Sequence, residues 1–210
     1  MHVDWLNADA PAANCRSAES TRACARRVAR FSLAPSPELG ERAARIAECH
    51  GPGSGRVQGA GTLTDEVVLA ALRAALPPEL ATALRPNCEW YSCRGAHFHN
   101  DAHYGGVLFG AWYVAGPETD IVFPRIGLRF ASRVGTAIVF DPFEPHGVLS
   151  PAQRTYAAGD YAGAEPSVFL AFEIALTGAV RAAFAIGAPT SGAVELSSER
   201  AVNAETGALS

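Results

Sequence analysis

The sequence predicts a mainly β fold with flanking helices, and three observations carry this prediction. Eight short segments after residue 87 are rich in Val, Ile, Phe, Tyr and Trp, and turn residues separate them. The residues before 87 are rich in alanine and arginine and contain helix start signals. The chain has 210 residues, 49% hydrophobic and 18% charged, which is the profile of a folded globular domain. Short strands with regular turn signals are typical of an all-β sandwich or barrel, which commonly carries helices outside it.

The first 32 residues are predicted to be loose at the start and helical after it. Residues 1–16 show no periodicity and are predicted to be loose. Residues 17–32 carry Cys24, Val28 and Phe31 at helical spacing, and their arginines fall mostly on another face. This spacing predicts a helix over 17–32 whose arginine face is solvated.

Helix start and stop signals predict three further helices, so that residues 17–86 form a helical support. The run Ser-Pro-Glu at 36–38 is typical of a helix start, since it supplies a cap, a proline in the first turn and an acid. A glycine-rich run at 51–55 is expected to end that helix in a loop. The run Thr-Asp-Glu at 64–66 begins the next helix. We therefore expect helices over residues 37–50, 64–76 and 77–84.

The second part of the chain is expected to form the β core, over residues 87–176. The eight predicted strands lie around residues 89–93, 97–101, 107–114, 120–123, 128–130, 136–140, 147–149 and 168–176. Residues 151–166 form a long excursion before the last strand, and such loops are often lids. The tail at 187–210 is expected to fray. Together these parts predict one domain over residues 1–210.

The charged residues exclude several functions. There are 17 basic and 21 acidic side chains, and every basic one is arginine. Without lysine the chain has no Schiff-base lysine and no phosphate-binding loop of the Gly-Lys-Ser/Thr type. A net charge of −4 argues against a surface that neutralises nucleic-acid phosphates.

The cysteines and the hydropathy pattern predict a cytoplasmic protein with no membrane partner. Five cysteines is an odd number and none are spaced Cys-x-x-Cys, which argues against a disulfide framework or a four-cysteine zinc site. We therefore expect reduced thiols. The first residues lack the features of a signal peptide, and the longest apolar runs are shorter than the roughly 18 residues that span a bilayer. The cysteines are Cys15, Cys24, Cys49, Cys88 and Cys93.

The residue types that carry chemistry gather in the run His97-Phe98-His99-Asn100-Asp101-Ala102-His103. In a strand, residues two apart point to the same face, so His97, His99 and Asp101 are expected to point together. His146 follows the strand predicted at 136–140. Two histidines and one carboxylate on neighbouring strands, with open positions left over, form the facial triad of non-haem ferrous oxygenases.

Four motifs carry a resemblance to a known family. They are Tyr91-x-x-x-Gly95-x-x-x-His99-x-Asp101, Thr119-Asp120-Ile121-Val122-Phe123-Pro124, Gly135-Thr136-Ala137-Ile138-Val139-Phe140 and Pro145-His146-Gly147-Val148. This part of the chain, about residues 88–176, resembles the 2-oxoglutarate- and Fe(II)-dependent oxygenase superfamily. The Phe-Pro, Gly-x-Ala-x-x-Phe and His pattern is most similar to its prolyl-hydroxylase-like branch.

The resemblance implies a double-stranded β-helix (jelly-roll) core and a set of site residues. By position, His99, Asp101 and His146 are the implied ligands of Fe(II). The implied activity is that of a dioxygenase that uses dioxygen and 2-oxoglutarate as cosubstrates. It hydroxylates an unactivated C–H bond of a small molecule, or of an amino-acid or peptide side chain, and releases succinate and CO2. The substrate and the oligomeric state stay open.

One element departs from the family pattern. The family anchors the distal carboxylate of 2-oxoglutarate with a basic residue on the last core strand, and here residues 167–176 contain none. Arg154 is the nearest candidate after His146, because a guanidinium grips a carboxylate with two hydrogen bonds. Tyr91 is a second candidate contact for the cosubstrate. The alternative arginines are Arg94, Arg125 and Arg129.

Two other functional interpretations stay open. A cupin-type metalloprotein without 2-oxoglutarate is favoured by His97-x-His99, and its metal ligands would be His97, His99 and His146. A non-catalytic jelly-roll binding module is favoured by the missing arginine on the last strand. The roles of His97 and His103 are open, between substrate contact, support of a ligand, and surface or packing. Turn and cap chemistry is the preferred interpretation of Asp141 and Glu144.

Overall fold

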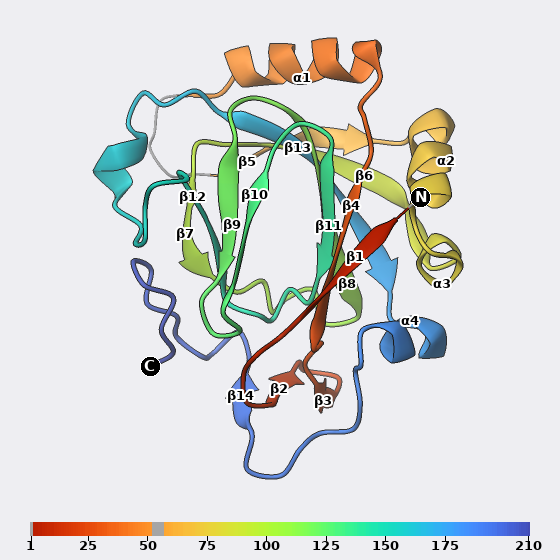
Figure 1. Cartoon of the computed structure of the whole chain (residues 1–210), viewed down its shortest axis with the longest axis vertical. Helices are drawn as coiled ribbons and strands as arrows, with labels where there is room; N and C mark the ends of the chain where they lie inside the picture. Colours follow the sequence, from red (N-terminus) through yellow and green to blue (C-terminus); the bar gives the residue numbers. More distant parts are fainter. Residues whose placement is uncertain (1, 52–56) are drawn as a thin grey trace.

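The computed structural model describes residues 2–51 and 57–210, and two antiparallel sheets face each other at its centre (Figure 1). In spatial order, the larger sheet contains β1 (Val3–Asn7), β4 (Arg27–Ser32), β11 (Thr136–Phe140), β8 (Val107–Ala115), β13 (Ser167–Ala175), β6 (Leu84–Cys93) and β5 (Val57–Leu63). The smaller sheet contains β10 (Leu128–Ser132), β9 (Thr119–Phe123), β12 (His146–Leu149) and β7 (Ala96–His99).

The strand order of β6 to β13 is that of a jelly roll. These eight strands divide equally between the sheets, as β11-β8-β13-β6 and β10-β9-β12-β7. The chain crosses from one sheet to the other at nearly every step, and strands far apart in sequence pair, as β6 does with β13. All eight strands predicted after residue 87 are present, with ends within a few residues of the predicted ones. The mainly β prediction is therefore confirmed.

Two apolar clusters lie on the two faces of the larger sheet. The inner cluster fills the space between the sheets and includes Tyr113, Phe123, Phe140 and Phe169. The outer cluster lies beneath the helices and includes Trp112, which faces away from its neighbour Tyr113. Alternate residues of one strand face opposite sides of the sheet, so β8 contributes side chains to both clusters.

The helices cover the outer face of the larger sheet. They are α1 (Pro37–Glu48), α2 (Glu66–Ala75), α3 (Pro78–Ala81) and α4 (Gly178–Ala183). The Ser36 side chain caps α1 by accepting a hydrogen bond from the Leu39 amide, and Asp65 caps α2 in the same way. The helices predicted near 37–50, 64–76 and 77–84 are thus present. Positions 52–55 of the predicted loop lie outside the described residues.

The helix predicted over 17–32 is wrong. This segment instead contains β3 (Thr21–Ala23) and β4, and β4 pairs with β1 on one side and β11 on the other. Val28, Ala29 and Phe31 are buried because β4 has apolar neighbours on both faces, so its apolar residues do not alternate as in a half-buried strand. Arg22 is buried as well, contrary to the predicted solvated arginine face.

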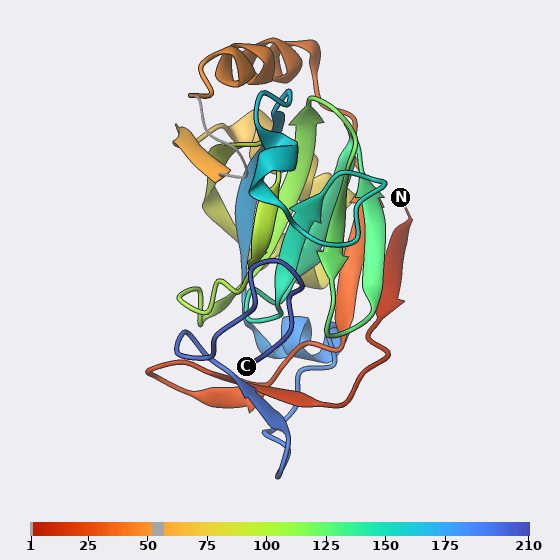
Figure 2. The same cartoon turned by 90° about the vertical axis from the view of Figure 1, so that its left-hand side faces the viewer.

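The predictions of a loose start and a frayed tail are also wrong. A third, small sheet joins β2 (Ala13–Arg16) to β3 and, in parallel, to β14 (Val194–Leu196). Figures 1 and 2 show this sheet at the end of the molecule opposite α1. The tail continues over β7, where the Phe98 amide donates to the Ala204 carbonyl. Leu196 is fully buried, which holds the tail in place.

Cys15 and Cys24 form a disulfide that closes the β2–β3 hairpin, which corrects the expectation of reduced thiols throughout. The remaining cysteines, Cys49, Cys88 and Cys93, are free. A buried disulfide removes the premise on which a cytoplasmic location was predicted, because disulfides persist in oxidising compartments. None of the helices in the described part of the chain has the length and hydropathy needed to cross a membrane.

Candidate metal centre

The three predicted ligands come together at one end of the smaller sheet. His99 is the last residue of β7 and His146 the first of β12, and the two are register partners in this antiparallel pair. Asp101 lies just beyond the end of β7, in a turn and not on the strand as predicted. Its Oδ2 lies 3.8 Å from His99 Nε2 and 3.6 Å from His146 Nε2. One candidate ligand atom from each residue lies within 4.8 Å of the others, as a shared metal ion requires.

Backbone carbonyls fix which ring nitrogen of each histidine faces the candidate metal position between the three residues. His99 Nδ1 lies 2.7 Å from the carbonyl of His97, and His146 Nδ1 lies 2.9 Å from the carbonyl of Glu144. A carbonyl only accepts hydrogen bonds, so each Nδ1 carries the proton and donates it. In the neutral form of each ring the lone pair is then on Nε2, the nitrogen that faces Asp101. This is the tautomer that a metal-binding histidine needs, and the second hydrogen bond fixes its orientation.

Burial keeps His146 neutral. Desolvation, and then repulsion from His99, lowers the pKa of His146 to about 4, and the nearby Asp101 carboxylate only partly offsets this. The imidazole therefore needs no deprotonation before it binds a metal at neutral pH. His99 and Asp101 are more exposed, at 29% and 23% of their side chains, and lie on the open side of the site. A donor set of two imidazoles and one carboxylate suits Fe(II).

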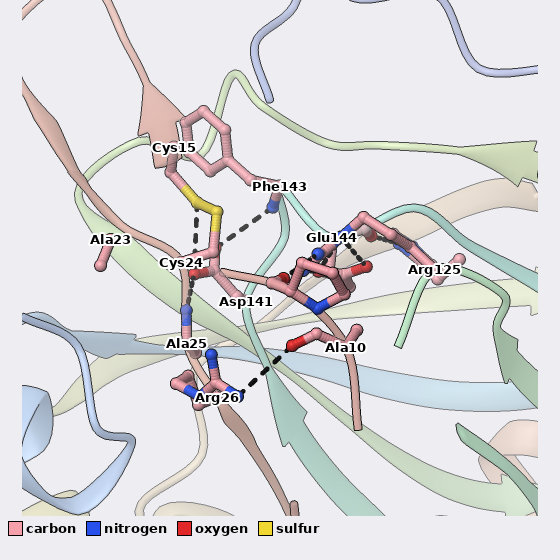
Figure 3. Close-up of polar contacts among 12 residues, drawn as sticks. Ala10, Cys15, Ala23, Cys24, Ala25, Arg26, Arg125, Asp141, Phe143 and Glu144 are labelled. Carbon is pink, nitrogen blue, oxygen red and sulfur yellow. Dashed lines mark hydrogen bonds and ion pairs between the residues drawn. A yellow bond between two sulfur atoms is a disulfide. The ribbon is translucent and has the colours of Figure 1, made fainter. Parts of the chain in front are cut away.

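A buried ion pair supports the turn that carries His146. Asp141 follows β11 directly, and Arg22 donates two hydrogen bonds to its carboxylate, at 2.6 and 2.9 Å. The Ala25 amide donates a third at 2.8 Å. Figure 3 shows Asp141 beside the Cys15–Cys24 disulfide, with dashed lines to the amides of Ala25 and Phe143. The small sheet and its disulfide thus hold the beginning of the 141–146 turn.

Hydrogen bonds connect the 141–146 turn to Asp101 and to Arg125. The Asp101 amide donates to the Pro142 carbonyl at 2.7 Å, which connects the Asp101 turn to the turn before His146. Glu144, 3% exposed, accepts three hydrogen bonds from Arg125, with the shortest at 2.5 Å. Burial still raises the pKa of Glu144 to about 7. Asp141 and Glu144 are therefore held in buried ion pairs, and the prediction of turn and cap chemistry missed their arginine partners.

A cavity of about 270 Å³ lies beside the three residues, between the two sheets. Aromatic and aliphatic side chains form most of its wall, and the polar groups at it besides the three residues include Tyr91, Tyr104 and Tyr113. Tyr91, the candidate cosubstrate contact, lines the cavity, and its hydroxyl donates to Glu89 Oε2 at 2.5 Å. Sequence reasoning missed the aromatic wall, because which residues face inward depends on strand register across the two sheets.

The predicted arginine anchors are not at this cavity. Arg154 is exposed and is not among the lining residues. Arg125 is paired with Glu144, and Arg129 with Asp120 at 2.6 Å. Arg129 also binds carbonyls of the excursion at 151–153, so it holds that segment. Arg94 donates to the Gly51 carbonyl and does not line the cavity.

The two remaining histidines of the motif differ in position. His97 is exposed and is not part of the cluster, and its ring centre lies 5.5 Å from that of His99. The ligand set of the cupin interpretation, in which His97 replaces Asp101, is therefore not the set brought together here. His103 is exposed at the edge of the cavity and its ring is tilted against that of Tyr104, with ring centres 4.1 Å apart and planes at 41°.

Comparisons with known proteins give similar folds and no close relative. No family model matches the chain, and no curated protein matches it. The structure is similar to a prolyl-4-hydroxylase from Pseudomonas putida, with 16% identity, a TM-score of 0.44, and coverage of 72% of this chain and 93% of that one. It is also similar to an oxidoreductase of the 2OG-Fe(II) oxygenase family from Burkholderia pseudomallei, with 13% identity, a TM-score of 0.32, and coverage of 83% and 73%. These scores are too low to carry a function to this chain.

Proposed function

We propose that this protein is an Fe(II)-dependent oxygenase with a 2-oxo acid as cosubstrate. His99, Asp101 and His146 would hold the metal. The observation that carries the proposal is the pair of histidines whose Nε2 atoms both face Asp101 Oδ2, with each Nδ1 tied to a carbonyl. A buried, oriented and neutral imidazole beside a carboxylate is costly to keep without a metal to bind.

The sequence motifs supply the reaction class, and 2-oxoglutarate is the cosubstrate that their resemblance implies. The bound iron would supply dioxygen activation, with one oxygen atom passing to a substrate C–H bond and the other to the acid formed as the 2-oxo acid loses CO2. With 2-oxoglutarate that acid is succinate. A small molecule, or an amino-acid or peptide side chain, is the proposed substrate, since the cavity is small and His99 and Asp101 beside it are partly exposed.

The chain's own residues have three roles in this proposal. The carbonyls of His97 and Glu144 accept hydrogen bonds from Nδ1 of His99 and His146, so that Nε2 of each ring faces the metal position. The Arg22–Asp141 pair and the disulfide hold the turn before His146, and the Pro142 carbonyl holds Asp101. The apolar wall of the cavity excludes water from the reacting groups, which strengthens the electrostatic interactions there.

Anaerobic Fe(II) binding tests the proposal. We expect about one Fe(II) per chain in the wild-type protein, and loss of binding in Asp101→Ala and His146→Ala. His97→Ala is the matched control, because His97 lies on the same strand and outside the cluster. Retained binding in Asp101→Ala with loss in His97→Ala would instead establish the cupin ligand set. Absence of any binding to the folded wild-type protein would leave the non-catalytic module.

A further inference from the structure

The aromatic wall of the cavity forms a continuous row across the larger sheet. Phe169 on β13 is the register partner of Tyr91 on β6 and of Tyr113 on β8. Phe169 stacks on Tyr91 with ring centres 5.4 Å apart and planes at 16°, and its ring centre lies 5.7 Å from that of Tyr113. All three line the cavity that the triad borders. We call these three residues the aromatic row.

The electrostatic character of the cavity is neutral to negative. Among the described residues that line it, Asp101 is the charged group, and none is an arginine. A second carboxylate, Glu89, is exposed on β6 two residues before Tyr91, and its Oε2 accepts a hydrogen bond from the Tyr91 hydroxyl at 2.5 Å. Burial and this hydrogen bond raise the pKa of Tyr91, so its hydroxyl stays neutral. His103 is the nearest potential cation at the cavity and is exposed at its edge.

The charges in the proposed iron site balance with one carboxylate from the cosubstrate. Fe(II) carries two positive charges and Asp101 one negative charge, so one carboxylate next to the metal makes the site neutral. A second carboxylate at the far end of the same molecule would lie against a mostly apolar wall, whose described residues offer tyrosine hydroxyls but no arginine to pair with it. Burying such a group without a partner is strongly unfavourable.

We infer that the 2-oxo acid of this site carries an apolar group at its far end, aromatic or branched aliphatic, in place of a second carboxylate. The inference rests on the proposed iron site and departs from 2-oxoglutarate, the cosubstrate that the sequence motifs imply. An aromatic or aliphatic end gains contact with the aromatic row, and aromatic pairs add stabilisation beyond the area they bury. Phe169 sets this preference, because it occupies the cavity-facing position on the last core strand.

The test is anaerobic titration of the Fe(II)-loaded protein with phenylpyruvate, 4-methyl-2-oxopentanoate and 2-oxoglutarate. Binding is followed by the visible charge-transfer band of the iron chelate, and calorimetry with Mn(II) in place of iron gives a second readout. We expect the apolar acids to bind about 10- to 100-fold more tightly than 2-oxoglutarate, which is the cost of one buried unpaired polar group. Equal or tighter binding of 2-oxoglutarate would overturn the inference.

A charge-introducing variant reverses the expected preference. Phe169→Arg places a guanidinium in the aromatic row, so it should strengthen 2-oxoglutarate binding and weaken phenylpyruvate binding. Glu89→Gln, which only removes the neighbouring negative charge, should strengthen 2-oxoglutarate binding modestly and keeps the test valid if Phe169→Arg does not fold. Arg154→Ala is the control and should change neither affinity, because Arg154 is exposed and away from the cavity.

The outcomes separate this inference from the proposed function. If Fe(II) does not bind, the proposed function fails and so does the inference built on it. If Fe(II) binds and 2-oxoglutarate is preferred, or if Arg154→Ala abolishes its binding, the inference alone fails. If Fe(II) binds and none of the three acids changes the spectrum or the calorimetric signal, the site does not take a 2-oxo acid and the inference is wrong.

Discussion

Replacing Arg22 with methionine should be among the most destabilising single changes in this protein. The side chains of Arg22 and Asp141 are 4% and 2% exposed, so both charges are out of water. Arg22→Met removes two charge-assisted hydrogen bonds, at 2.6 and 2.9 Å, and leaves the Asp141 carboxylate with the Ala25 amide and the longer Phe143 contact. Breaking a buried pair in this way costs about 3 to 5 kcal/mol. That is a large share of the roughly 5 to 15 kcal/mol that stabilises a typical domain.

Urea unfolding, followed by tryptophan fluorescence and far-UV circular dichroism, measures this cost. Arg16→Met is the matched control, because Arg16 lies on the neighbouring strand in an exposed pair with Glu195 at 3.2 Å. An exposed pair of this kind contributes at most about 1 kcal/mol. The double variant Arg22→Met/Asp141→Leu should recover most of the loss, since it leaves no unpaired charge. A cost for Arg22→Met no larger than that for Arg16→Met would refute this reasoning.

Three further predictions follow from the packing and the titrating groups. Reduction of Cys15–Cys24 should lower the free energy of unfolding by about 3 kcal/mol, the loop-closure value for a crosslink of this span, whereas Cys49→Ser changes it little. Because the folded pKa of His146 is about 4 and its ordinary value is 6.5, the unfolded metal-free chain takes up the proton first as pH falls. His146 should therefore make stability fall by up to about 3 kcal/mol between pH 6.5 and 4, and unfolding curves of His146→Gln should lack this component. Gly95→Ala should cost about 2 to 4 kcal/mol, because Gly95 has φ +139° and an added Cβ would lie 2.4 Å from the Tyr161 ring. Gly159→Ala, in open space, is the comparison, and equal unfolding midpoints for the two glycine variants would contradict the packing argument.

The β core and the proximity of His99 to Asp101 could be predicted from sequence because their signals are local. Each core strand is a short apolar run bounded by turn residues, and the His99–Asp101 spacing places two candidate ligands two residues apart, at the end of β7 and just beyond it. The pairing with His146 needed the family motifs, since sequence spacing alone does not say that β7 and β12 are neighbours. The structure places them side by side, with His99 and His146 as register partners.

The sequence-based predictions are wrong where contacts with distant segments determine the local structure. The spacing of Cys24, Val28 and Phe31 matches a helix. The segment forms β4 instead, because pairing with β1 and β11 supplies hydrogen bonds on both sides of the strand. The tail looked frayed because its alanines and serines carry no periodicity, and its order comes from parallel pairing with β2. The partners of Asp141 and Glu144 were missed for the same reason, since Arg22 and Arg125 are far from them in sequence.

The most direct test of the central claim is the location of a bound metal ion by anomalous diffraction. Crystals grown without oxygen and soaked in Fe(II), or in Mn(II) as a redox-stable substitute, would be measured at the absorption edge of the metal. The proposed site predicts one peak per chain within ligand distance of His99 Nε2, His146 Nε2 and a carboxylate oxygen of Asp101. A well-ordered triad without a peak, or a peak bound by His97 instead of Asp101, would contradict it.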